Sequence, residues 1–320
     1  MGYKKLALFY DPIFLTHDTG SHPESSARLE AIMSYLDSAD INRYIERLPS
    51  LKSATIEHIS LAHTLSYIEH VKTKVESGSF QLDLDTAICR NSYNVALEAV
   101  SANIVAVDTL LDPANNLTRA FCPVRPPGHH ALPNSSMGFC IFNNIAISAK
   151  YALTLNGINK VAIIDFDLHH GNGTEAIVQN NDSILFISSH QSPLYPGTGL
   201  EEENHLKPPN IINYNLHSGD DDLPFCQLYE RKILPKLLEF KPDILFFSAG
   251  FDGHKNDPLG GLNLTEDGFF QVTKIIVDAL ESIGTKYIIS SLEGGYDLDA
   301  LPTSVEAHLA ALIGVDNVIV

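Results

Sequence analysis

The sequence contains few cysteines, and none of them is close to another in the chain. Its 320 residues include four, and they form no Cys-x-x-Cys pair: Cys89, Cys122, Cys140 and Cys226. This wide spacing argues against a disulfide framework and against a cysteine-rich zinc finger. We interpret all four as ordinary buried thiols of a protein in a reducing compartment.

Basic side chains are also scarce. There are 21 Lys and Arg residues against 39 Asp and Glu residues, which gives a formal net charge of −18. A nucleic-acid-binding protein needs a basic surface to neutralise phosphates, so no direct nucleic-acid partner is expected. An acidic surface most often serves solubility, but it also suits cationic partners such as lysine-rich chains or polyamines.

Long apolar runs are missing by inspection of the sequence. We find no stretch that approaches the roughly 18 apolar residues of a membrane span, so no membrane association is expected. The segment Met1–Pro12 has two lysines and an apolar run too short for a signal peptide, and it is interpreted as a first strand. A cytoplasmic protein is expected, although signal-independent export would leave no trace in the sequence. A homo-oligomer is compatible with all of these features.

The residues that are present indicate a globular α/β protein. Hydrophobic residues make up 44% and charged residues 19% of the chain. Short apolar runs recur along it, and several are apolar throughout, which is typical of parallel strands buried on both faces. The predicted strands are Leu6–Tyr10, Ala120–Val124, Val161–Phe166, Ile184–Ser188, Ile211–Leu216, Ile244–Ser248 and Tyr287–Leu292.

Helical patterns lie between these runs. Thr265 is the expected N-cap of one of them, because acidic residues follow it in the first turn. Since strands and helices alternate without a repeat or a linker, we predict one doubly wound α/β domain over residues 1–320. The predicted helices are Ser26–Ser38, Ser92–Leu111, Asn144–Leu155, Leu223–Phe240, Glu266–Ile283 and Asp299–Ile313.

Unusual polar segments follow four of the predicted strands. Sites in open α/β sheets form beyond the carboxyl ends of the strands, so these segments are expected to meet at one edge. They are Arg125-Pro-Pro-Gly-His-His-Ala131, Asp165-Phe-Asp-Leu-His-His-Gly-Asn-Gly-Thr-Glu175, Ala249-Gly-Phe-Asp-Gly-His254 and Glu293-Gly-Gly-Tyr-Asp297.

One of these segments predicts a metal site. Asp167 and His169 are two residues apart as the chain leaves a strand, so period-two geometry places both side chains on one side. Asp252, at another strand end, is the natural third ligand. One nitrogen and two carboxylates with an open position describe a catalytic zinc, whose charge the carboxylates nearly cancel, so that a nearby base is needed. The alternative is that the acids cap helices and His169 packs.

The base is expected among two adjacent histidines. His129 and His130 follow a rigid Pro-Pro-Gly turn, and their expected partners are Asp165 and Asn172. An aspartate raises the pKa of the imidazole that it holds, whereas a neutral asparagine does so much less. We therefore predict His130 as general base and acid and His129 as its electrostatic partner. Asp165 has two alternatives, namely binding a monovalent cation beneath the zinc or capping backbone amides.

Tyr296 completes the predicted catalytic set. It follows two glycines, and a phenol on such a turn could swing in and donate a hydrogen bond to an oxyanion opposite the zinc. The alternative is a buried core tyrosine.

Together these segments resemble the histone deacetylase family of zinc amidohydrolases, and most closely its class II branch and bacterial relatives. The resemblance extends from His22 to the final helix and rests on the strings RPPGHHA, GFCIFNN, DFDLHHGNGTE, PGTG, AGFDGHKNDPLG and LEGGY. It implies a single-domain arginase/deacetylase fold, with a mostly parallel sheet of about eight strands flanked by helices.

The resemblance also implies residue roles. Asp167, His169 and Asp252 match the zinc ligands, while His129, His130 and Tyr296 match the catalytic residues. Potassium is implied near Asp165, Asp167, His169, Ser188 and Ser189. The substrate tunnel is implied to include Gly138, Phe139, Tyr195 (where the family commonly has Phe) and Leu259, with Arg28 near the product exit.

The implied substrate is acyl-lysine in proteins or peptides, with acetyl-lysine favoured. Leu259 occupies the position where polyamine-selective relatives carry an acid, and an apolar residue cannot attract a distal ammonium. An acetylpolyamine substrate stays open, because Asp83, Asp85 or the acidic residues 201–203 could supply the carboxylate. Two further alternatives are a catalytically silent acyl-lysine-binding domain and a binuclear manganese ureohydrolase.

Overall fold

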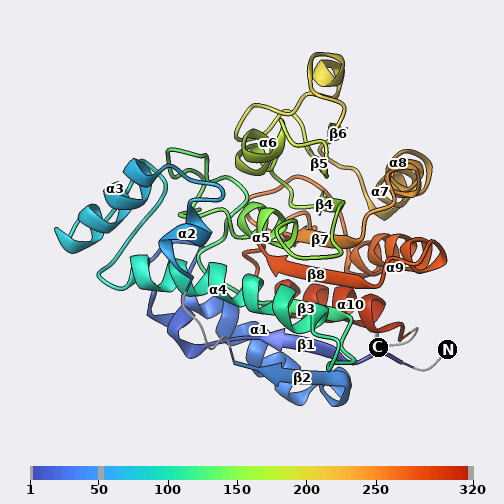
Figure 1. Cartoon of the computed structure of the whole chain (residues 1–320), viewed down its shortest axis with the longest axis horizontal. Helices are drawn as coiled ribbons and strands as arrows, with labels where there is room; N and C mark the ends of the chain where they lie inside the picture. Colours follow the sequence, from blue (N-terminus) through green and yellow to red (C-terminus); the bar gives the residue numbers. More distant parts are fainter. Residues whose placement is uncertain (1–2, 50–53, 316–320) are drawn as a thin grey trace.

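The computed structural model describes residues 3–49 and 54–315, which build one eight-stranded sheet. All its strand pairs are parallel, in the order β2-β1-β3-β8-β7-β4-β5-β6 (Figure 1). Every predicted apolar run forms a strand. The bounds are β1 Leu6–Phe9, β2 Ile45–Leu48, β3 Arg119–Cys122, β4 Val161–Asp165, β5 Ile184–Gln191, β6 Ile211–Leu216, β7 Ile244–Ala249 and β8 Tyr287–Leu292.

The edge strand β2 is absent from the prediction. Its sequence, Ile-Glu-Arg-Leu, contains no apolar run, and none of its four residues is buried. It becomes a strand because its backbone pairs with β1, which is a tertiary contact that composition does not report.

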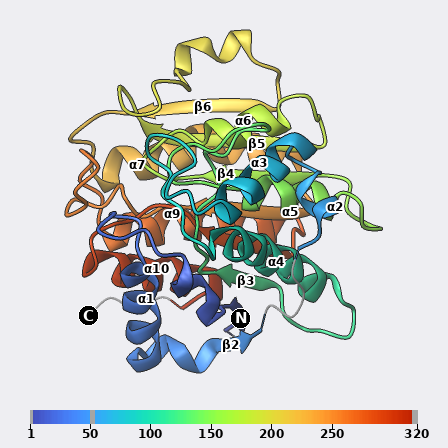
Figure 2. The ribbon, with the colours of Figure 1, turned by 90° about the vertical axis from the view of Figure 1, so that its left-hand side faces the viewer.

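Helices cover both faces of the sheet (Figure 2). α4 and α5 pack on one face, and α1, α9 and α10 lie on the other. The predicted helices form, but the one predicted over residues 223–240 is divided into shorter pieces. The α-helices are α1 Ser26–Ser38, α2 Ile56–Ile59, α3 Leu65–Glu76, α4 Ser92–Leu111, α5 Asn144–Ala152, α6 Asn172–Val178, α7 Asp222–Leu228, α8 Leu234–Phe240, α9 Glu266–Ser282 and α10 Ala300–Ile313; the 3-10 turns are η1 Pro12–Thr16, η2 Asp40–Tyr44 and η3 Glu201–Leu206.

The segment predicted as one helix over 223–240 is α7, a π-helical turn and α8. The π turn, η4 (Tyr229–Ile233), lies directly before Pro235 at the start of α8. Because proline has no N–H to donate, the regular hydrogen-bond ladder cannot run through this point. Thr265 lies at the N-cap of α9 as expected, but it makes no side-chain cap and instead donates its hydroxyl to Asp222.

One helix corrects an expectation. By length and composition α4 could cross a membrane, contrary to the prediction that no segment reaches this threshold. In the structure 67% of its apolar window is buried, and it packs against α5 and β3. Packing in the core accounts for its hydrophobicity.

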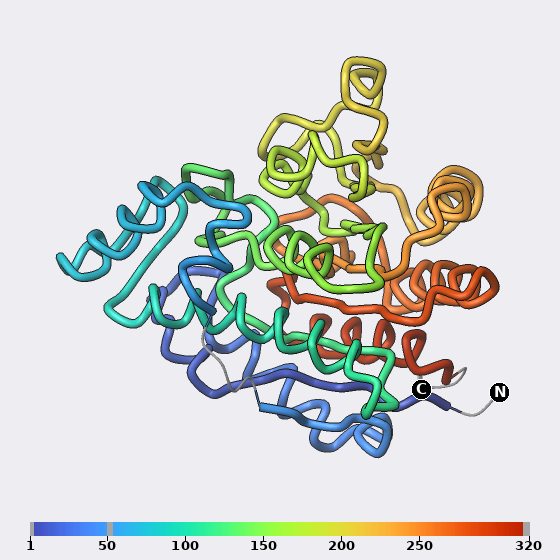
Figure 3. The backbone as a smooth tube through the Cα atoms, in the orientation of Figure 1, coloured from blue at the N-terminus to red at the C-terminus, as the bar shows by residue number. Residues whose placement is uncertain are grey.

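The order of the strands decides where the polar segments meet. β3, β8, β7 and β4 are consecutive neighbours in the sheet, so the loops that follow their carboxyl ends emerge side by side. The backbone trace in Figure 3 also shows the first strand running beside the last helix, where the Lys4 amide donates to the Ile313 carbonyl at 3.1 Å. The expected edge of the sheet thus carries all four polar segments.

Candidate active site and metal centre

A cavity of about 310 Å³ opens at this edge of the sheet. The segments after β3, β4, β7 and β8 all contribute to its walls, together with residues from two further loops. Its lining is Asp85, Pro127, His129, His130, Gly138, Phe139, His169, Leu194, Tyr195, Leu259, Gly294 and Tyr296. The four residues expected in a substrate tunnel, Gly138, Phe139, Tyr195 and Leu259, therefore surround one cavity with both histidines and Tyr296.

Asp167, His169 and Asp252 form a cluster at the base of this cavity. His169 Nδ1 lies 2.9 Å from Asp252 Oδ2 and 3.2 Å from Asp167 Oδ1. One ligand atom from each residue lies within 4.8 Å of the others, which suits a single metal ion. The alternation of a strand, which was expected to place Asp167 and His169 on one side, is not the reason for this convergence. Both residues lie beyond the end of β4, at Asp165. A turn, in which the His169 amide donates to Asp167 Oδ1 at 2.8 Å, brings them together.

Glycine next to the cluster makes room for the two carboxylates. A Cβ atom on Gly294 would lie 2.4 Å from Asp252 Oδ2 and 2.6 Å from Asp167 Oδ2. The Gly294 amide instead donates to Asp167 Oδ2 at 2.8 Å, while the Leu168 amide donates to Asp252 Oδ1 at 3.0 Å. The backbone thus orients both carboxylates with their oxygens toward His169.

The electrostatics of the cluster favour a cation. Burial and the neighbouring Asp167 raise the pKa of Asp252. Burial opposes charge on His169, but Asp167 and Asp252 outweigh it and raise the pKa of His169 to about 10. In the protein alone the proton on His169 is the counter-charge of two buried carboxylates, and a divalent ion would replace it. A nitrogen and two carboxylate oxygens are ligands that zinc accepts, so the donor set fits this metal.

The two adjacent histidines have different partners. His129 Nδ1 donates to Asp165 Oδ2 at 3.0 Å, whereas His130 Nδ1 donates to Asn172 Oδ1 at 2.7 Å. Asn172, the first residue of α6, comes from the segment that follows β4. Because Nδ1 of His130 carries the hydrogen, its Nε2 atom is a free acceptor on a ring that lines the cavity.

The surroundings of the two histidines move their pKa values in opposite directions. Burial opposes charge on His129, but Asp167 and Asp165 outweigh it and raise the pKa of His129 well above its usual value. Burial, together with the neighbouring His129 and His169, lowers the pKa of His130 well below its usual value. His130 is therefore the neutral imidazole of the pair, which is the form that accepts a proton.

Tyr296 lines the cavity on a turn that is held firmly. Arg28, fully buried, donates from Nε to the Gly295 carbonyl and from Nη2 to the Glu293 carbonyl, both at 2.6 Å. Its guanidinium also lies 4.8 Å from the centre of the Tyr296 ring. The glycines were expected to provide mobility, but Gly295 has φ of +115°, so glycine suits the shape of the turn itself.

Three buried acidic residues, to which the sequence analysis assigned no role, also contact the site. Glu24 binds the guanidinium of Arg125 through both carboxylate oxygens, and Asp257 accepts the Tyr296 amide at 2.7 Å. Glu293 accepts the amides of Gly128 and His129. These amides belong to the segment after β3 that carries both histidines, residues 125–131, which is called the histidine loop below. Asp257 and Glu293 lie in motifs quoted above, where a charged residue was the signal available to find them. Glu24 lies two residues after His22, where the resemblance begins.

Of the residues expected near potassium, Asp167 and His169 belong to the cluster, and Asp165, Ser188 and Ser189 are all buried. The Ser188 hydroxyl pairs with His190 Nδ1 at 2.9 Å, and the Ser189 hydroxyl pairs with Tyr229 Oη at 2.9 Å. Asp165 Oδ1 accepts the Asp167 amide at 3.1 Å. A potassium site here stays a prediction. His170 pairs with Thr198 at 2.8 Å and Glu175 at 3.1 Å.

The candidate carboxylates for polyamine binding are separated by the fold. Asp85 lines the cavity and accepts the Tyr195 hydroxyl and the Gly138 amide, both at 3.1 Å. Asp83 pairs with Ser136 and does not belong to the lining residues. The acidic residues 201–203 lie in η3, which also contributes no side chain to this cavity.

Comparison with known proteins decides the family. Residues 22–312 match the model of the histone deacetylase domain. The chain belongs to the histone deacetylase family. This confirms the assignment made from the motifs, and it makes the protein a hydrolase that acts on amides. The family is generally zinc-dependent, in agreement with the donor set of the cluster.

Individual relatives of this histone deacetylase family member cover nearly its whole length. Protein slr0245 of Synechocystis is 40% identical over 96% of the chain and 99% of the relative. A probable deacetylase of Archaeoglobus fulgidus is 35% identical over 97% of the chain and 86% of the relative. The crystal structure of the HDA15 HD domain superposes with a TM-score of 0.88 at 29% identity, covering 98% of this chain and 90% of that one. These matches confirm the predicted fold.

Proposed function

We propose that this deacetylase hydrolyses the amide of acyl-lysine in proteins or peptides, with acetyl-lysine as the main substrate, and releases acetate and free lysine. One observation carries the proposal. His169, which belongs to the cluster with Asp167 and Asp252, lines the same cavity as a neutral imidazole, His130, and a phenol, Tyr296. Metal ligands, a base and an oxyanion donor are the parts that amide hydrolysis needs.

Asp167, His169 and Asp252 are the residues proposed to hold one zinc ion. Zinc supplies a Lewis acid that polarises the amide carbonyl and lowers the pKa of water. His130 Nε2 takes the proton of the attacking water and later delivers it to the lysine amine. His129, held by Asp165, carries the positive charge that balances the developing negative charge, and the Tyr296 hydroxyl donates to the oxyanion.

Apolar walls support a lysine side chain as the group that enters the cavity. The rings of Phe139 and Tyr195 and the side chain of Leu259 line it, and they suit a tetramethylene stem. Leu259 offers no charge to a distal ammonium. We also propose that potassium binds near Asp165, Ser188 and Ser189, as the resemblance to the family implies.

Acetylpolyamine is the second candidate substrate, and Asp85 is the observation that favours it. Its carboxylate lines the cavity beside Tyr195, where it could face a second ammonium group. Both Asp85 oxygens already accept hydrogen bonds within the protein, which favours the lysine substrate.

The test compares kcat/KM of the zinc-loaded protein on acetyl-lysine peptides, longer acyl-lysine peptides and acetylpolyamines. We expect acetyl-lysine peptides to react fastest. Asp252→Ala is expected to lose zinc by metal analysis and with it all turnover. Faster hydrolysis of acetylpolyamine would select the second candidate. A zinc-loaded protein that cleaves none of these substrates would be a binding domain, and two manganese ions per chain would indicate a ureohydrolase.

A further inference from the structure

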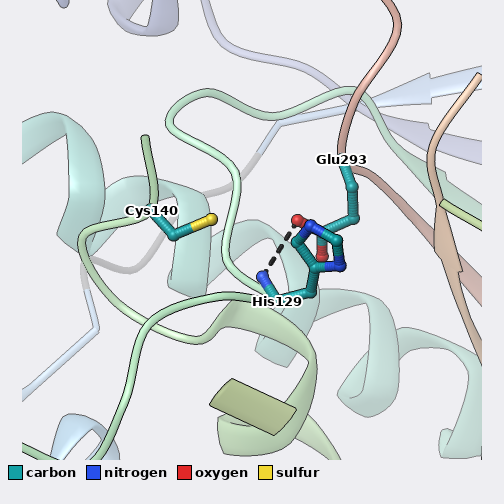
Figure 4. A group of neighbouring side chains, drawn as sticks. All are labelled: His129, Cys140 and Glu293. Carbon is teal, nitrogen blue, oxygen red and sulfur yellow. Dashed lines mark hydrogen bonds between the residues drawn. The ribbon is translucent and has the colours of Figure 1, made fainter. Parts of the chain in front are cut away.

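Glu293 is a fully buried carboxylate at the edge of the active site that has no part in the chemistry above. It follows β8 directly, and its side chain points toward the loop after β3, as Figure 4 shows for the hydrogen bond to the His129 amide. Oε2 accepts the backbone amide of Gly128 at 2.7 Å and that of His129 at 3.1 Å. One oxygen atom thus holds the amides of Gly128 and His129, two consecutive residues of the loop that carries both imidazoles.

The other oxygen of Glu293 is anchored to a third strand. The Ser248 hydroxyl, on β7, donates to Oε1 at 3.2 Å. The backbone of the same residue is also fixed, because its amide donates to the Ala249 carbonyl at 2.9 Å and its carbonyl accepts Arg28. The carboxylate therefore has a defined position relative to the sheet.

The residues directly after Glu293 contact the cluster and include Tyr296, so the position of Glu293 is linked to these groups as well. The Gly294 amide binds Asp167 Oδ2 at 2.8 Å, and Tyr296 follows two residues later. One short segment thus contacts the histidine loop through the Glu293 side chain and the cluster through the backbone of Gly294, and it places Tyr296 in the wall of the cavity. The Glu293 side chain is thus one of the contacts that set the distance between the imidazoles and the cluster, together with the Thr174 amide, which donates to the His129 carbonyl at 3.0 Å.

We propose that Glu293 is a positioning residue, which sets the His129–His130 backbone at the correct distance from the Asp167–His169–Asp252 cluster. The inference rests on the proposed hydrolase function. If Glu293 acts by position, the length of its side chain and its acceptor oxygen are essential, and its negative charge is secondary.

A pair of variants separates reach from charge. Glu293→Gln keeps the length and an acceptor oxygen for both amides, and its amide group can donate to the Ser248 hydroxyl. Glu293→Asp keeps the charge but is one C–C bond, about 1.5 Å, shorter. A displacement of about 1 Å in an active site can cost about 10²-fold in rate. We expect kcat of the Asp variant to fall by about 10²-fold, with KM and zinc content nearly unchanged, and kcat of the Gln variant to exceed it at least tenfold.

Glu306 provides a matched control. It is also buried and accepts a hydrogen bond from Tyr35 at 2.6 Å, but it lies on α10 and does not line the cavity. Its Gln and Asp variants are expected to show the same kcat as each other. If Glu293→Asp is faster than Glu293→Gln, charge and not position is what matters, and the proposal is wrong. A second metal ion that binds the wild type at His129, Cys140 and Glu293 and is lost in Glu293→Gln would also overturn it.

Two measurements keep the test decisive if a variant misfolds or the substrate is wrong. Ser248→Ala leaves Glu293 in place and frees Oε1, so kcat is expected to fall about fivefold, as for loss of one hydrogen bond. An unchanged kcat would contradict the proposal. Crystal structures of the wild type and Glu293→Asp need no turnover. A shift of about 1 Å in the His129 imidazole is expected, and an unmoved loop overturns the inference even when the wild type hydrolyses nothing.

Discussion

His129 and His130 are adjacent in the chain but hydrogen-bond to different side chains. His129 is paired with the carboxylate of Asp165, and His130 is paired with the neutral amide of Asn172. The pKa of His129 is raised and that of His130 is lowered. These surroundings favour the protonated form of His129 and the neutral form of His130, and the neutral form is the one that accepts a proton.

Replacing each histidine in turn tests this division. We expect His130→Ala to abolish turnover more completely than His129→Ala, because the first removes the proton acceptor and the second removes only a stabilising charge. The measurement is kcat on an acetyl-lysine peptide, with zinc content as the control. If the order of the two variants is reversed, the roles have to be exchanged.

The phenol of Tyr296 is the second test at the scale of one residue. Burial raises its pKa well above the usual value, so it stays a hydrogen-bond donor at every working pH. Tyr296→Phe is expected to reduce kcat by roughly 10²–10³-fold, as for the loss of one oxyanion donor, and to leave the zinc content unchanged. Full activity in this variant would assign the tyrosine to packing.

At the scale of elements, a buried ion pair joins the segment before α1 to the histidine loop. Arg125 precedes that loop, and Glu24 binds its guanidinium through both oxygens. Burial opposes the charge on Glu24, but Arg125 outweighs it and lowers the pKa of Glu24 to about 2. Arg28, which holds the turn before Tyr296, also contacts Glu24 at 3.4 Å. Two catalytic loops thus share one carboxylate.

This pair predicts acid sensitivity with a definite sign. Because the folded-state pKa of Glu24 is depressed below the usual 4.5, its stabilisation is present above pH 4.5 and is lost as the pH falls toward 2. The shift corresponds to about 3 kcal/mol. We expect Glu24→Gln to be less stable at pH 7, since two buried guanidinium groups lose their anion, and to show a smaller decrease between pH 5 and pH 2. Urea unfolding at several pH values measures both, and parallel curves for the two proteins would refute the linkage.

At the scale of the whole molecule, the metal cluster connects separate strands. Asp167 and His169 follow β4, Asp252 follows β7, and Gly294 after β8 donates to Asp167. An ion that binds only this folded arrangement must stabilise the fold. At a free zinc concentration 100 times Kd the gain is about 3 kcal/mol.

Removal of zinc is therefore expected to lower the Tm of the protein by roughly 5 °C or more. Differential scanning calorimetry of the chelated and the reloaded protein measures the shift. Asp252→Ala serves as the control, because its Tm should not respond to zinc. The same response in both proteins would place the metal elsewhere.

Much of the fold could be predicted because its signals are local. Every apolar run became a buried strand, since a strand buried on both faces needs consecutive apolar residues. The edge strand β2 gave no such signal, because pairing with β1 alone makes it a strand. The burial of α4 likewise depends on contacts with distant residues, whereas the break before Pro235 has a local cause, the missing N–H of the proline.

The sequence by itself determined the parallel sheet and the chemistry-bearing motifs, including the pairs of residue types available for a metal and a base. The tertiary structure decided which of them meet. It paired Asp165 with His129 and Asn172 with His130, selected Asp85 over Asp83 as a cavity wall, and gave Glu293 its hold on the histidine loop. The physical reason is that motifs are read from neighbours in the chain, whereas partners in a buried site come from strands far apart in sequence, which only the order of the sheet brings together.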